Sequence, residues 1–391
     1  MSELPIPTPF AKRRPRLNSL TSLRFFAALL IFILHSKDHG LIPLSFLESF
    51  DLSKAVSFFF VLSGFVLTYS YHRRHYSISR FYCHRFARIW PITFFLLLFI
   101  LIFLPQSLFL PVNSSFPSFF LTFLSHIFLL QSIIPIPQVY FGFNAVAWSI
   151  SVEAIFYILF PAFNSLRTSK LFLRSSFLSV LLLIFSFCIQ LFAFPEFSPH
   201  HLDSIVWEGF TYINPLFRLP EFIFGILAAR LFMHISTSSF QFPFSLPSKI
   251  FGRAFFEIFV LLGSLYLGFS PIASPPSFPY QQYISQIFSA FFFSIAIYIS
   301  ASSRSFIMYL LNIPILILLG EVSFGFYLIH QPLLIMAAQG GGFWLLGYNF
   351  LPNSLAVLFP LSIVLASLSY YLVEKPAQKY IRMAYDSFAG V

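Results

Sequence analysis

The amino-acid sequence predicts an all-α polytopic membrane protein with about ten transmembrane helices, one re-entrant or interfacial segment and both termini in the cytoplasm. Of its 391 residues, 58% are hydrophobic and only 9% are charged, whereas charged residues make up about 25% of soluble domains. The mean hydropathy is +0.83. Apolar runs of membrane-spanning length recur from one end of the chain to the other, and no polar stretch between them is long enough for a sizeable soluble domain.

Eleven apolar runs are candidates for these helices, since each approaches the roughly 20 residues that cross a bilayer. They lie at residues 20–36, 55–72, 88–104, 118–135, 146–163, 174–194, 211–231, 254–270, 284–301, 319–338 and 354–373. The first run follows a basic segment, as the apolar part of a signal peptide does. It is nevertheless predicted to be a retained helix, because it is too long, contains Arg24 and has no small-residue cleavage site before His35.

The run at 118–135 is the doubtful one, because it contains His126 and Gln131 and is closed by prolines on both sides. The positive-inside rule, which places Lys and Arg in cytoplasmic segments, decides whether it spans. If it does not span and the N-terminus is inside, 19 of the 23 Lys and Arg residues are cytoplasmic. If it spans, every later loop changes side and only 9 remain inside. The charges therefore favour ten spans, with 118–137 as the re-entrant or interfacial element on the outer side.

The chain is predicted to have a basic cytoplasmic tail at 1–16, one transmembrane domain at 17–382 and a short C-terminal tail at 383–391. The net charge of +10 does not indicate a nucleic-acid partner. The basic residues are scattered between apolar spans, where they set orientation and contact anionic membrane lipid. No metal is expected, because the two cysteines do not have the spacing of metal ligands.

The first predicted helix carries two ionisable residues, Arg24 and His35, on one face. Eleven residues separate them, which amounts to three helical turns plus roughly 20° and about 16 Å along the axis. Ionisable groups inside a membrane cost a few kcal/mol each on insertion scales, so they face protein or a water-filled cavity by default. The alternative is that each side chain reaches its nearer interface, Arg24 on the inside and His35 on the outside.

The run at 146–163 offers a partner for His35. Ser149, Glu153 and Tyr157 follow each other at four-residue intervals and share one helical face. Glu153 lies about two turns below the outer surface, a depth that His35 can share. Its carboxylate could hold the tautomer of the imidazole and stabilise the protonated form, as the acid of a catalytic dyad does. A purely structural interhelical hydrogen bond is the alternative.

A second group of charges lies at the cytoplasmic start of the run at 88–104. Arg85 and Arg88 are neighbours on a helix, and Arg80, His84 and Arg88 share one face. Paired guanidinium groups suit a phosphorylated ligand, because their planar forks bind phosphate oxygens in pairs. Juxtamembrane arginines also mark the cytoplasmic side and bind anionic lipid, and the residues alone leave both interpretations open.

Two further stretches are interpreted mainly as packing and hydrogen-bonding segments. The pair Ser63-Gly64 lies within the run at 55–72, where small residues allow helices to approach closely. The last polar stretch within an apolar run, residues 320–332, directs Glu321, Ser323, Tyr327 and His330 toward the bundle.

The chain resembles the membrane-bound acyltransferase-3 family, which includes bacterial O-antigen and polysaccharide O-acetylases. Seven stretches carry the resemblance, in the order in which the family has them, and together they cover nearly the whole chain. They are LTSLRFFAALLIFILH (20–35), VSFFFVLSGFVLTY (56–69), RFYCHRFARIWP (80–91), WSISVEAIFYILFP (148–161), FRLPEFIFGILAA (217–229), GEVSFGFYLIHQP (320–332) and LVEKPAQKYI (372–381).

The resemblance implies a multi-pass enzyme of the bacterial inner membrane. It would move an acyl group, usually acetyl, from cytoplasmic acyl-CoA to a hydroxyl of an envelope carbohydrate or glycolipid such as lipopolysaccharide O-antigen. By position, His35 matches the family's essential histidine, and Arg85 and Arg88 match its Arg-x-x-Arg motif, which is linked to the CoA donor. Glu153 matches the acidic residue of its Trp-Ser-x-x-x-Glu stretch, and Arg24 matches the arginine of its opening segment, so Arg24 is also expected at the acyl-CoA site.

Two mechanisms and one other class of function remain open at this point. His35 could act as a general base toward the acceptor hydroxyl, or it could carry the acyl group as a transient acyl-histidine. A proton-coupled membrane transporter would also place His, Glu and Arg residues in membrane helices. A transporter should show broken helices or an inverted repeat, and neither is clear in the sequence.

Overall fold

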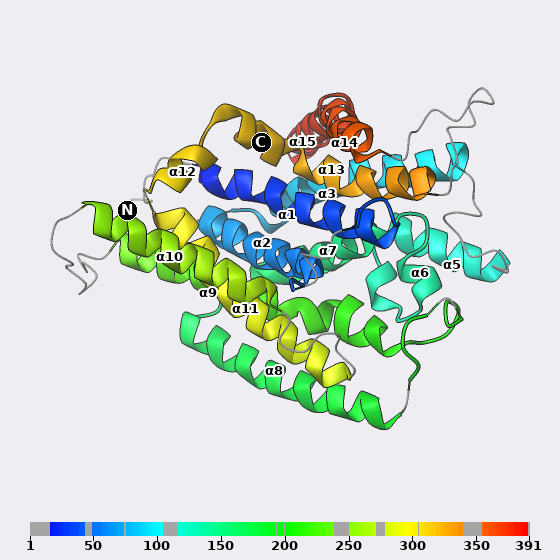
Figure 1. Ribbon diagram of the computed structural model, residues 1–391, viewed down its shortest axis with the longest axis horizontal. Coiled ribbons are helices and arrows are strands. Elements are labelled where there is room, and N and C mark those ends of the chain that lie inside the picture. Colours follow the sequence, from blue (N-terminus) through cyan, green and yellow to red (C-terminus); the bar gives the residue numbers. More distant parts are fainter. Residues whose placement is uncertain are drawn as a thin grey trace, which may run out of the picture.

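The computed structural model describes a bundle of helices, with no strand among the residues it describes (Figure 1). These are residues 16–43, 49–73, 76–104, 116–192, 194–198, 200–237, 250–270, 278–303, 305–338 and 354–389. The longer helices are α1 (Asn18–Asp38), α2 (Ala55–Tyr71), α3 (Ile78–Phe103), α5 (Phe116–Ile127), α7 (Trp148–Ser165), α8 (Thr168–Leu191), α9 (Pro215–Thr237), α10 (Ile250–Phe269), α11 (Pro279–Ser302), α13 (Pro314–Ala338), α14 (Leu355–Ser369) and α15 (Lys375–Ala389). The short elements are η2 (Leu52–Lys54), η3 (Gln131–Ile133), α6 (Pro137–Tyr140), η4 (Ala145–Ala147), η5 (Gly209–Ile213), α12 (Phe306–Leu311) and η6 (Tyr370–Glu374).

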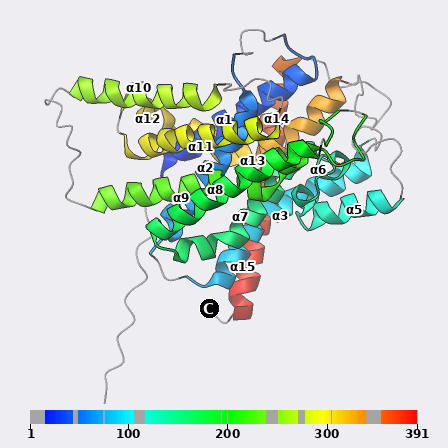
Figure 2. The same ribbon diagram turned by 90° about the horizontal axis from the view of Figure 1, so that it is seen from below.

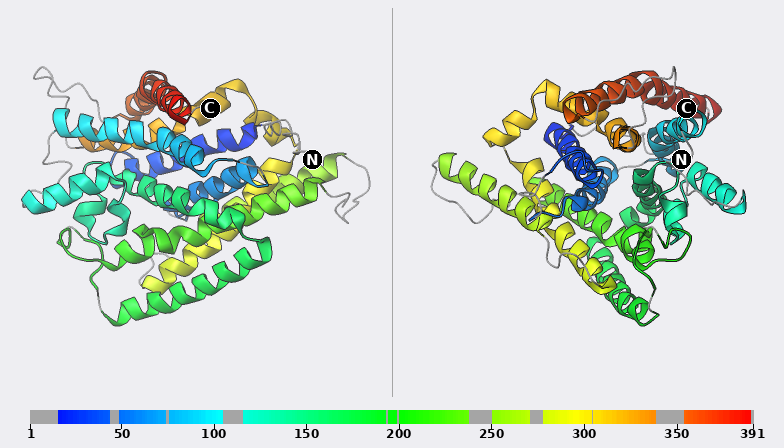
Figure 3. Two further views of the ribbon diagram at one scale, coloured as in Figure 1. Left: turned by 180° about the vertical axis from the view of Figure 1, so that it is seen from behind. Right: turned by 45° about the vertical axis from the view of Figure 1, so that its right-hand side comes forward.

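Helices α1 and α2 form the centre of the bundle. Helix α1 packs along α13, and α2 packs along α9. The pair α14–α15 and the helix α8 lie on opposite sides of the molecule (Figure 3). Large apolar side chains of α8, such as Phe172, Phe177 and Leu191, are exposed. An apolar surface of this kind on the outside of a helix bundle suits contact with lipid tails.

Eight of the described helical segments are long and apolar enough to cross a membrane. They include α1, α2, α3, α7, α8, α11, α13 and the continuous α14–α15. Helix α9 has 23 residues but carries three charged side chains, Arg218, Glu221 and Arg230, and the apolar part of α10 runs over only Phe255–Phe269. The all-helical membrane class is therefore confirmed, whereas the count of ten spans and the cytoplasmic position of the termini stay predictions.

The doubtful segment contains a helix of only 12 residues, α5. Such a helix is about 18 Å long, too short for a hydrocarbon core of about 30 Å. The two polar residues that cast doubt on the span are buried and bind backbone carbonyl groups: His126 Nε2 lies 2.9 Å from the Val139 oxygen, and Gln131 Nε2 donates to Ala147 at 3.0 Å. Protein thus covers the irregular backbone, as a non-spanning element at membrane depth requires.

Helices α2 and α9 approach closely at two glycines. A Cβ atom added to Gly64 would lie 2.0 Å from the Phe222 carbonyl oxygen, and one added to Gly225 would lie 1.9 Å from the Val61 carbonyl oxygen. The small-residue interpretation of Ser63-Gly64 is therefore confirmed.

Close to this contact, α9 holds a fully buried ion pair. The guanidinium of Arg218 lies 3.1 Å from Glu221 and 4.8 Å from the centre of the Tyr212 ring. Ser57 of α2 donates a hydrogen bond to the Glu221 carboxylate at 3.0 Å. The pair thus ties α9 to α2, which lines the site described below.

Helices α14 and α15 continue through η6 as one segment of 35 residues, Leu355–Ala389. Its length of about 52 Å exceeds the membrane thickness, so one end must project from the bilayer. Helix α15 projects from the bundle and pairs with the first turns of α3 (Figure 2). Arg80 forms an ion pair with Asp386 at 3.1 Å. The predicted domain limit at 382 therefore falls inside a helix, and residues 1–15 of the predicted N-terminal tail lie outside the described residues.

Replacing Gly64 or Gly225 with alanine should destabilise the protein, because in both cases the new methyl group meets backbone of the neighbouring helix. We expect each variant to lose about 1–3 kcal/mol of stability, as other overpacked cores do. The measurement is the thermal unfolding temperature of purified protein in detergent. Gly263→Ala in α10 is the matched control, because nothing lies within 4 Å of its added Cβ. Equal unfolding temperatures for all three variants would contradict the close helix contact.

Candidate functional site

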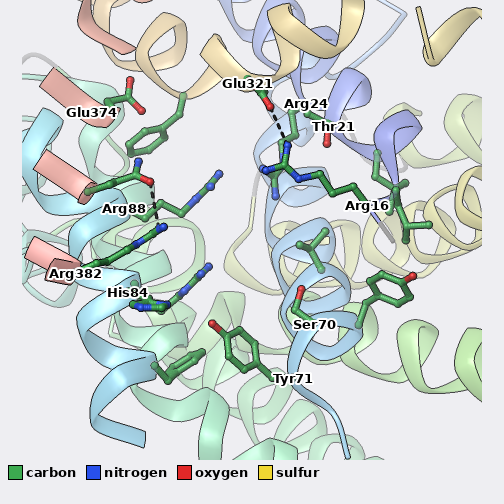
Figure 4. Close-up of a pocket in the computed structure, with 18 of the residues that line it drawn as sticks. Arg16, Thr21, Arg24, Ser70, Tyr71, His84, Arg88, Glu321, Glu374 and Arg382 are labelled. Atoms are coloured by element: carbon green, nitrogen blue, oxygen red, sulfur yellow. Dashed lines mark hydrogen bonds and ion pairs between the residues drawn. The ribbon is translucent and has the colours of Figure 1, made fainter. Parts of the chain in front are cut away.

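A cavity of about 750 Å³ opens at the end of the bundle where α1 and α3 begin and α2 ends. Helix α15 and the start of α13 complete its wall (Figure 4). Seven basic side chains line it: Arg16, Arg24, Arg80, Arg85, Arg88, Lys375 and Arg382. Only two carboxylates, those of Glu321 and Glu374, face them within the same lining. A surplus of five positive charges in a concave site favours a ligand that carries several negative charges.

Some of these cations are already paired within the protein. Arg16 forms an ion pair with Glu321 at 3.3 Å, and Tyr370 donates a hydrogen bond to the other oxygen of that carboxylate at 3.0 Å. Arg382 donates to the side-chain oxygen of Gln378 at 3.2 Å. The contacts of Glu321 join α13 to the segment before α1 and to η6.

Arg85 and Arg88 differ from these paired cations. Among the described residues, neither forms an ion pair with a carboxylate. The Arg85 guanidinium lies among three aromatic rings, with its carbon 5.9 Å from the centres of Tyr71 and Phe81 and 5.6 Å from that of Tyr157. Aromatic faces hold the guanidinium plane without neutralising its charge. Both side chains are therefore available to bind an anion, and a phosphorylated ligand is one of the two interpretations that the sequence left open.

A second, smaller chamber of about 70 Å³ continues the cavity into the bundle. The two share Arg24, Arg88 and Phe324 in their walls. Glu153 lies in the inner chamber, where its carboxylate accepts hydrogen bonds from Ser63 at 3.0 Å and from Tyr157. The charges of Arg85, Arg88 and Glu153 all act on Arg24. Arg24 thus stands at the junction between the two spaces.

A pair of histidines, His35 and His330, lies next to one wall of the inner chamber. Tyr327 lines the chamber, bonds to Ser149 at 2.9 Å and contacts the ring of His330, with the ring centres 5.9 Å apart. His330 Nε2 lies 3.0 Å from His35 Nδ1, and the two rings are nearly parallel, 12° apart. Through Tyr327, the arginine-lined cavity and His35 are connected along one row of side chains.

The loop before α7 fixes the position of this part of α13. Pro332 lies inside α13 and has no N–H, so the Leu328 carbonyl loses its helical donor. Asn144 Nδ2 donates to that carbonyl at 2.8 Å instead.

A third histidine, His39, lies next to α13 just after the end of α1. The Gln331 side chain lies 3.4 Å from His39 Nε2. Burial lowers the pKa of His39, so His39 is neutral at pH 7.

The predicted contact between Glu153 and His35 is not formed in the structure. His35 pairs with His330, and Glu153 pairs with Ser63 and Tyr157. The reason is the order of the helices: α1 packs on α13 and α2, and α2 in turn contacts α7, which carries Glu153. Matching depths in the sequence did not identify neighbouring helices.

The remaining predicted residues converge as expected, and others join them. Arg24, Arg85 and Arg88 share one cavity. Sequence reasoning assigned His330 and Glu321 to packing and counted Lys375 and Arg382 only as cytoplasmic charges. The signal that could have singled out His330 and Glu321 was their ionisable character within one apolar run, the argument already applied to Arg24 and His35.

Comparisons with known proteins identify the family of the chain. A family model described as an acyltransferase domain matches residues 17–373. Acyltransferase MdmB of Streptomyces mycarofaciens is 32% identical over 229 residues, which cover 55% of this chain and 57% of that protein. The match thus spans just over half the length of the relative. No solved structure matches the chain.

The family model extends over nearly the whole chain, and its limits contain Arg24, His35, Arg85, Arg88, Glu153 and His330. Arg24, Arg85, Arg88 and Glu153 line the adjoining cavity and chamber, and His35 and His330 form the histidine pair. The chain therefore belongs to the acyltransferase-3 family.

Proposed function

We propose that this protein transfers an acyl group, acetyl in the first instance, from acyl-CoA to a hydroxyl of an envelope carbohydrate such as lipopolysaccharide O-antigen. The observation that carries the proposal is the row of contacting side chains, Tyr327, His330 and His35, that runs from the inner chamber of a strongly basic cavity to the histidine pair. Membership of an acyltransferase family favours a transferase over a proton-coupled transporter.

The proposal places the basic cavity on the cytoplasmic side of a bacterial inner membrane. Supporting this orientation, the helix ends around the cavity carry Arg73, Arg80, Arg85, Lys375 and Arg382, and Lys and Arg gather in cytoplasmic segments. The histidine pair then lies toward the outer leaflet, where an envelope glycan or glycolipid would arrive. The donor and the acceptor would thus approach the reaction from opposite sides of the membrane.

Acyl-CoA suits the shape and charge of this path. Its phosphates would bind Arg85 and Arg88, whose planar forks match phosphate oxygens. Arg24 stands where the cavity narrows into the inner chamber. From Arg24 to His35 the rise along α1 is about 16 Å, so the donor needs a long, thin arm between its phosphates and its reactive carbonyl. The pantetheine arm of acyl-CoA is such a group.

In this proposal, His35 is the catalytic base of the transfer step. Its Nε2 would take the proton of the acceptor hydroxyl while the oxygen attacks the thioester carbonyl carbon. The carbon–sulfur bond breaks, and the leaving thiolate takes the proton from His35, which yields the ester and free CoA. In the alternative route, Nε2 itself attacks the carbonyl, the carbon–sulfur bond breaks and the CoA thiolate leaves, so that the acyl group rests on His35. The acceptor hydroxyl then attacks this acyl group, its proton goes to the CoA thiolate, and the carbon–nitrogen bond breaks to free His35. Glu153 has a different role in this proposal: it positions Arg24 and polar groups of the donor arm in the inner chamber.

Replacing Arg85 and Arg88 with lysine should weaken donor binding, because lysine keeps the charge but loses the paired hydrogen bonds. A hydrogen bond to a charged group contributes about 1.5–3 kcal/mol, so we expect about a tenfold or larger rise in the Kd of acetyl-CoA for the double variant. The measurement is isothermal titration of purified protein in nanodiscs.

Arg167→Lys is the matched control, because Arg167 directly precedes α8 and does not line the cavity. Its Kd should be that of the unaltered protein. If the double lysine variant binds acetyl-CoA as tightly as this control, Arg85 and Arg88 do not bind the donor and only set the orientation of the protein in the membrane.

Replacing His35 with glutamine or alanine should abolish transfer and leave acetyl-CoA binding intact, because the proton acceptor is lost while the phosphate site remains. General-base catalysis contributes about 10²–10⁴-fold, so kcat should fall by at least a hundredfold with little change in KM for acetyl-CoA. The measurement is transfer of labelled acetyl to extracted envelope glycolipid by purified protein in nanodiscs.

The exposed His200 supplies the control, and His200→Gln should transfer at the normal rate. Retained acetyl-CoA binding in the same preparation separates a missing chemical step from a misfolded protein. If purified His35→Gln transfers acetyl near the normal rate, the catalytic assignment is wrong.

A further inference from the structure

His330 is a buried imidazole in the middle of α13, with no exposed surface. Its ring is enclosed by those of Phe32, Phe326 and Tyr327, with ring centres 5.9–6.1 Å away. A polar ring enclosed in this way within a membrane bundle requires hydrogen-bond partners for its nitrogens. Both partners are present: His330 Nδ1 lies 3.3 Å from the Phe326 carbonyl oxygen, and His330 Nε2 lies 3.0 Å from His35 Nδ1.

The carbonyl oxygen decides where the protons lie. A carbonyl can only accept, so His330 Nδ1 carries a hydrogen and donates it to Phe326. A neutral imidazole has one protonated nitrogen, and His330 Nε2 is then an acceptor. His35 Nδ1 must donate to it. When both rings are uncharged, this is the arrangement that satisfies both contacts, and it leaves the lone pair of His35 on Nε2.

The same arrangement distinguishes the two histidines. Both nitrogens of His330 are occupied and the ring is buried, so His330 cannot reach a substrate. His35 is only half-buried, and among the described residues its Nε2 has no hydrogen-bond partner. Of the pair, His35 alone can therefore act on a reacting group.

We propose that His330 is a positioning residue: it fixes His35 in the tautomer with a bare Nε2 and stabilises the His35 imidazolium that forms during transfer. When His35 takes a proton, its Nδ1–H bond to His330 becomes charge-assisted and therefore stronger. The buried acid of a Ser-His-Asp triad orients its histidine in a similar way. Here a second imidazole, itself held by a backbone carbonyl, takes that place. The proposal rests on the proposed function of His35.

Two substitutions of His330 distinguish a role in positioning His35 from a role in packing alone. His330→Leu removes the acceptor but keeps an apolar side chain of similar bulk, whereas His330→Gln keeps an oxygen that can accept from His35 Nδ1. We expect His330→Leu to lower kcat about 10–100-fold or more, since a wrong tautomer costs the triad about 10⁴-fold. KM for acetyl-CoA should not change, because the arginine cavity is untouched. His330→Gln should recover most of the lost kcat.

Leu334→Met is the packing control, because Leu334 is buried on the same helix, one turn beyond His330. Its kcat and KM should be normal. The positioning role is overturned if His330→Leu keeps full kcat, or if the leucine and glutamine variants lose kcat equally, as a packing defect would produce. Failure of the proposed function has a different signature, namely near-normal transfer by His35→Gln, whatever the His330 variants do.

A measurement on the unaltered protein keeps the test independent of how the variants fold. Nitrogen-15 NMR of histidine-labelled protein distinguishes the two tautomers of each ring. We expect His35 protonated on Nδ1 and bare on Nε2 at a pH where it is neutral. A His35 ring protonated on Nε2 would contradict the inference directly.

Discussion

The cost of placing ionisable side chains inside a membrane is the constraint on which the rest of this structure depends. Each such group costs a few kcal/mol unless protein or water surrounds it. In this chain, Arg24, Glu153, His35 and His330 all belong to apolar helices, and all turn inward. The helices therefore pack so that these groups face the interior of the bundle, and the glycine contact between α2 and α9 holds α2, which lines both the cavity and the inner chamber.

The two ends of the row of side chains from the cavity to His35 have opposite electrostatic character. The cavity end is open and strongly basic, and among the described residues Arg85 and Arg88 form no ion pair with a carboxylate. The deeper end holds two imidazoles that share one hydrogen bond, and aromatic rings surround the inner one. An anionic donor would be held at the first end by charge, whereas the second end offers the imidazole of His35 as a base. This separation suits a transferase that binds its donor on one side of the membrane and reacts near the other.

The positions of most helices could be predicted from residue type alone, because apolar runs mark the helices and charged residues mark the segments between them. Residue type did not predict which helices are neighbours. Glu153 and His35 have compatible depths, yet α2 lies between their helices, and depth in a sequence carries no information on which helices adjoin. His330 was assigned to packing because only the fold brings its Nε2 within 3.0 Å of His35. Lys375 and Arg382 follow the last span, and only the continuous α14–α15 segment turns them toward the cavity.

We propose that a donor bound in the basic cavity extends to His35, and a structure with a non-hydrolysable acetyl-CoA analogue in nanodiscs tests this claim most directly. We predict phosphate groups on Arg85 and Arg88, the pantetheine arm passing Arg24 and Glu153, and the acyl carbonyl carbon within about 3–4 Å of His35 Nε2, the range of a reactive approach. An analogue whose phosphates lie outside the cavity, or whose acyl group ends away from His35, would contradict the claim.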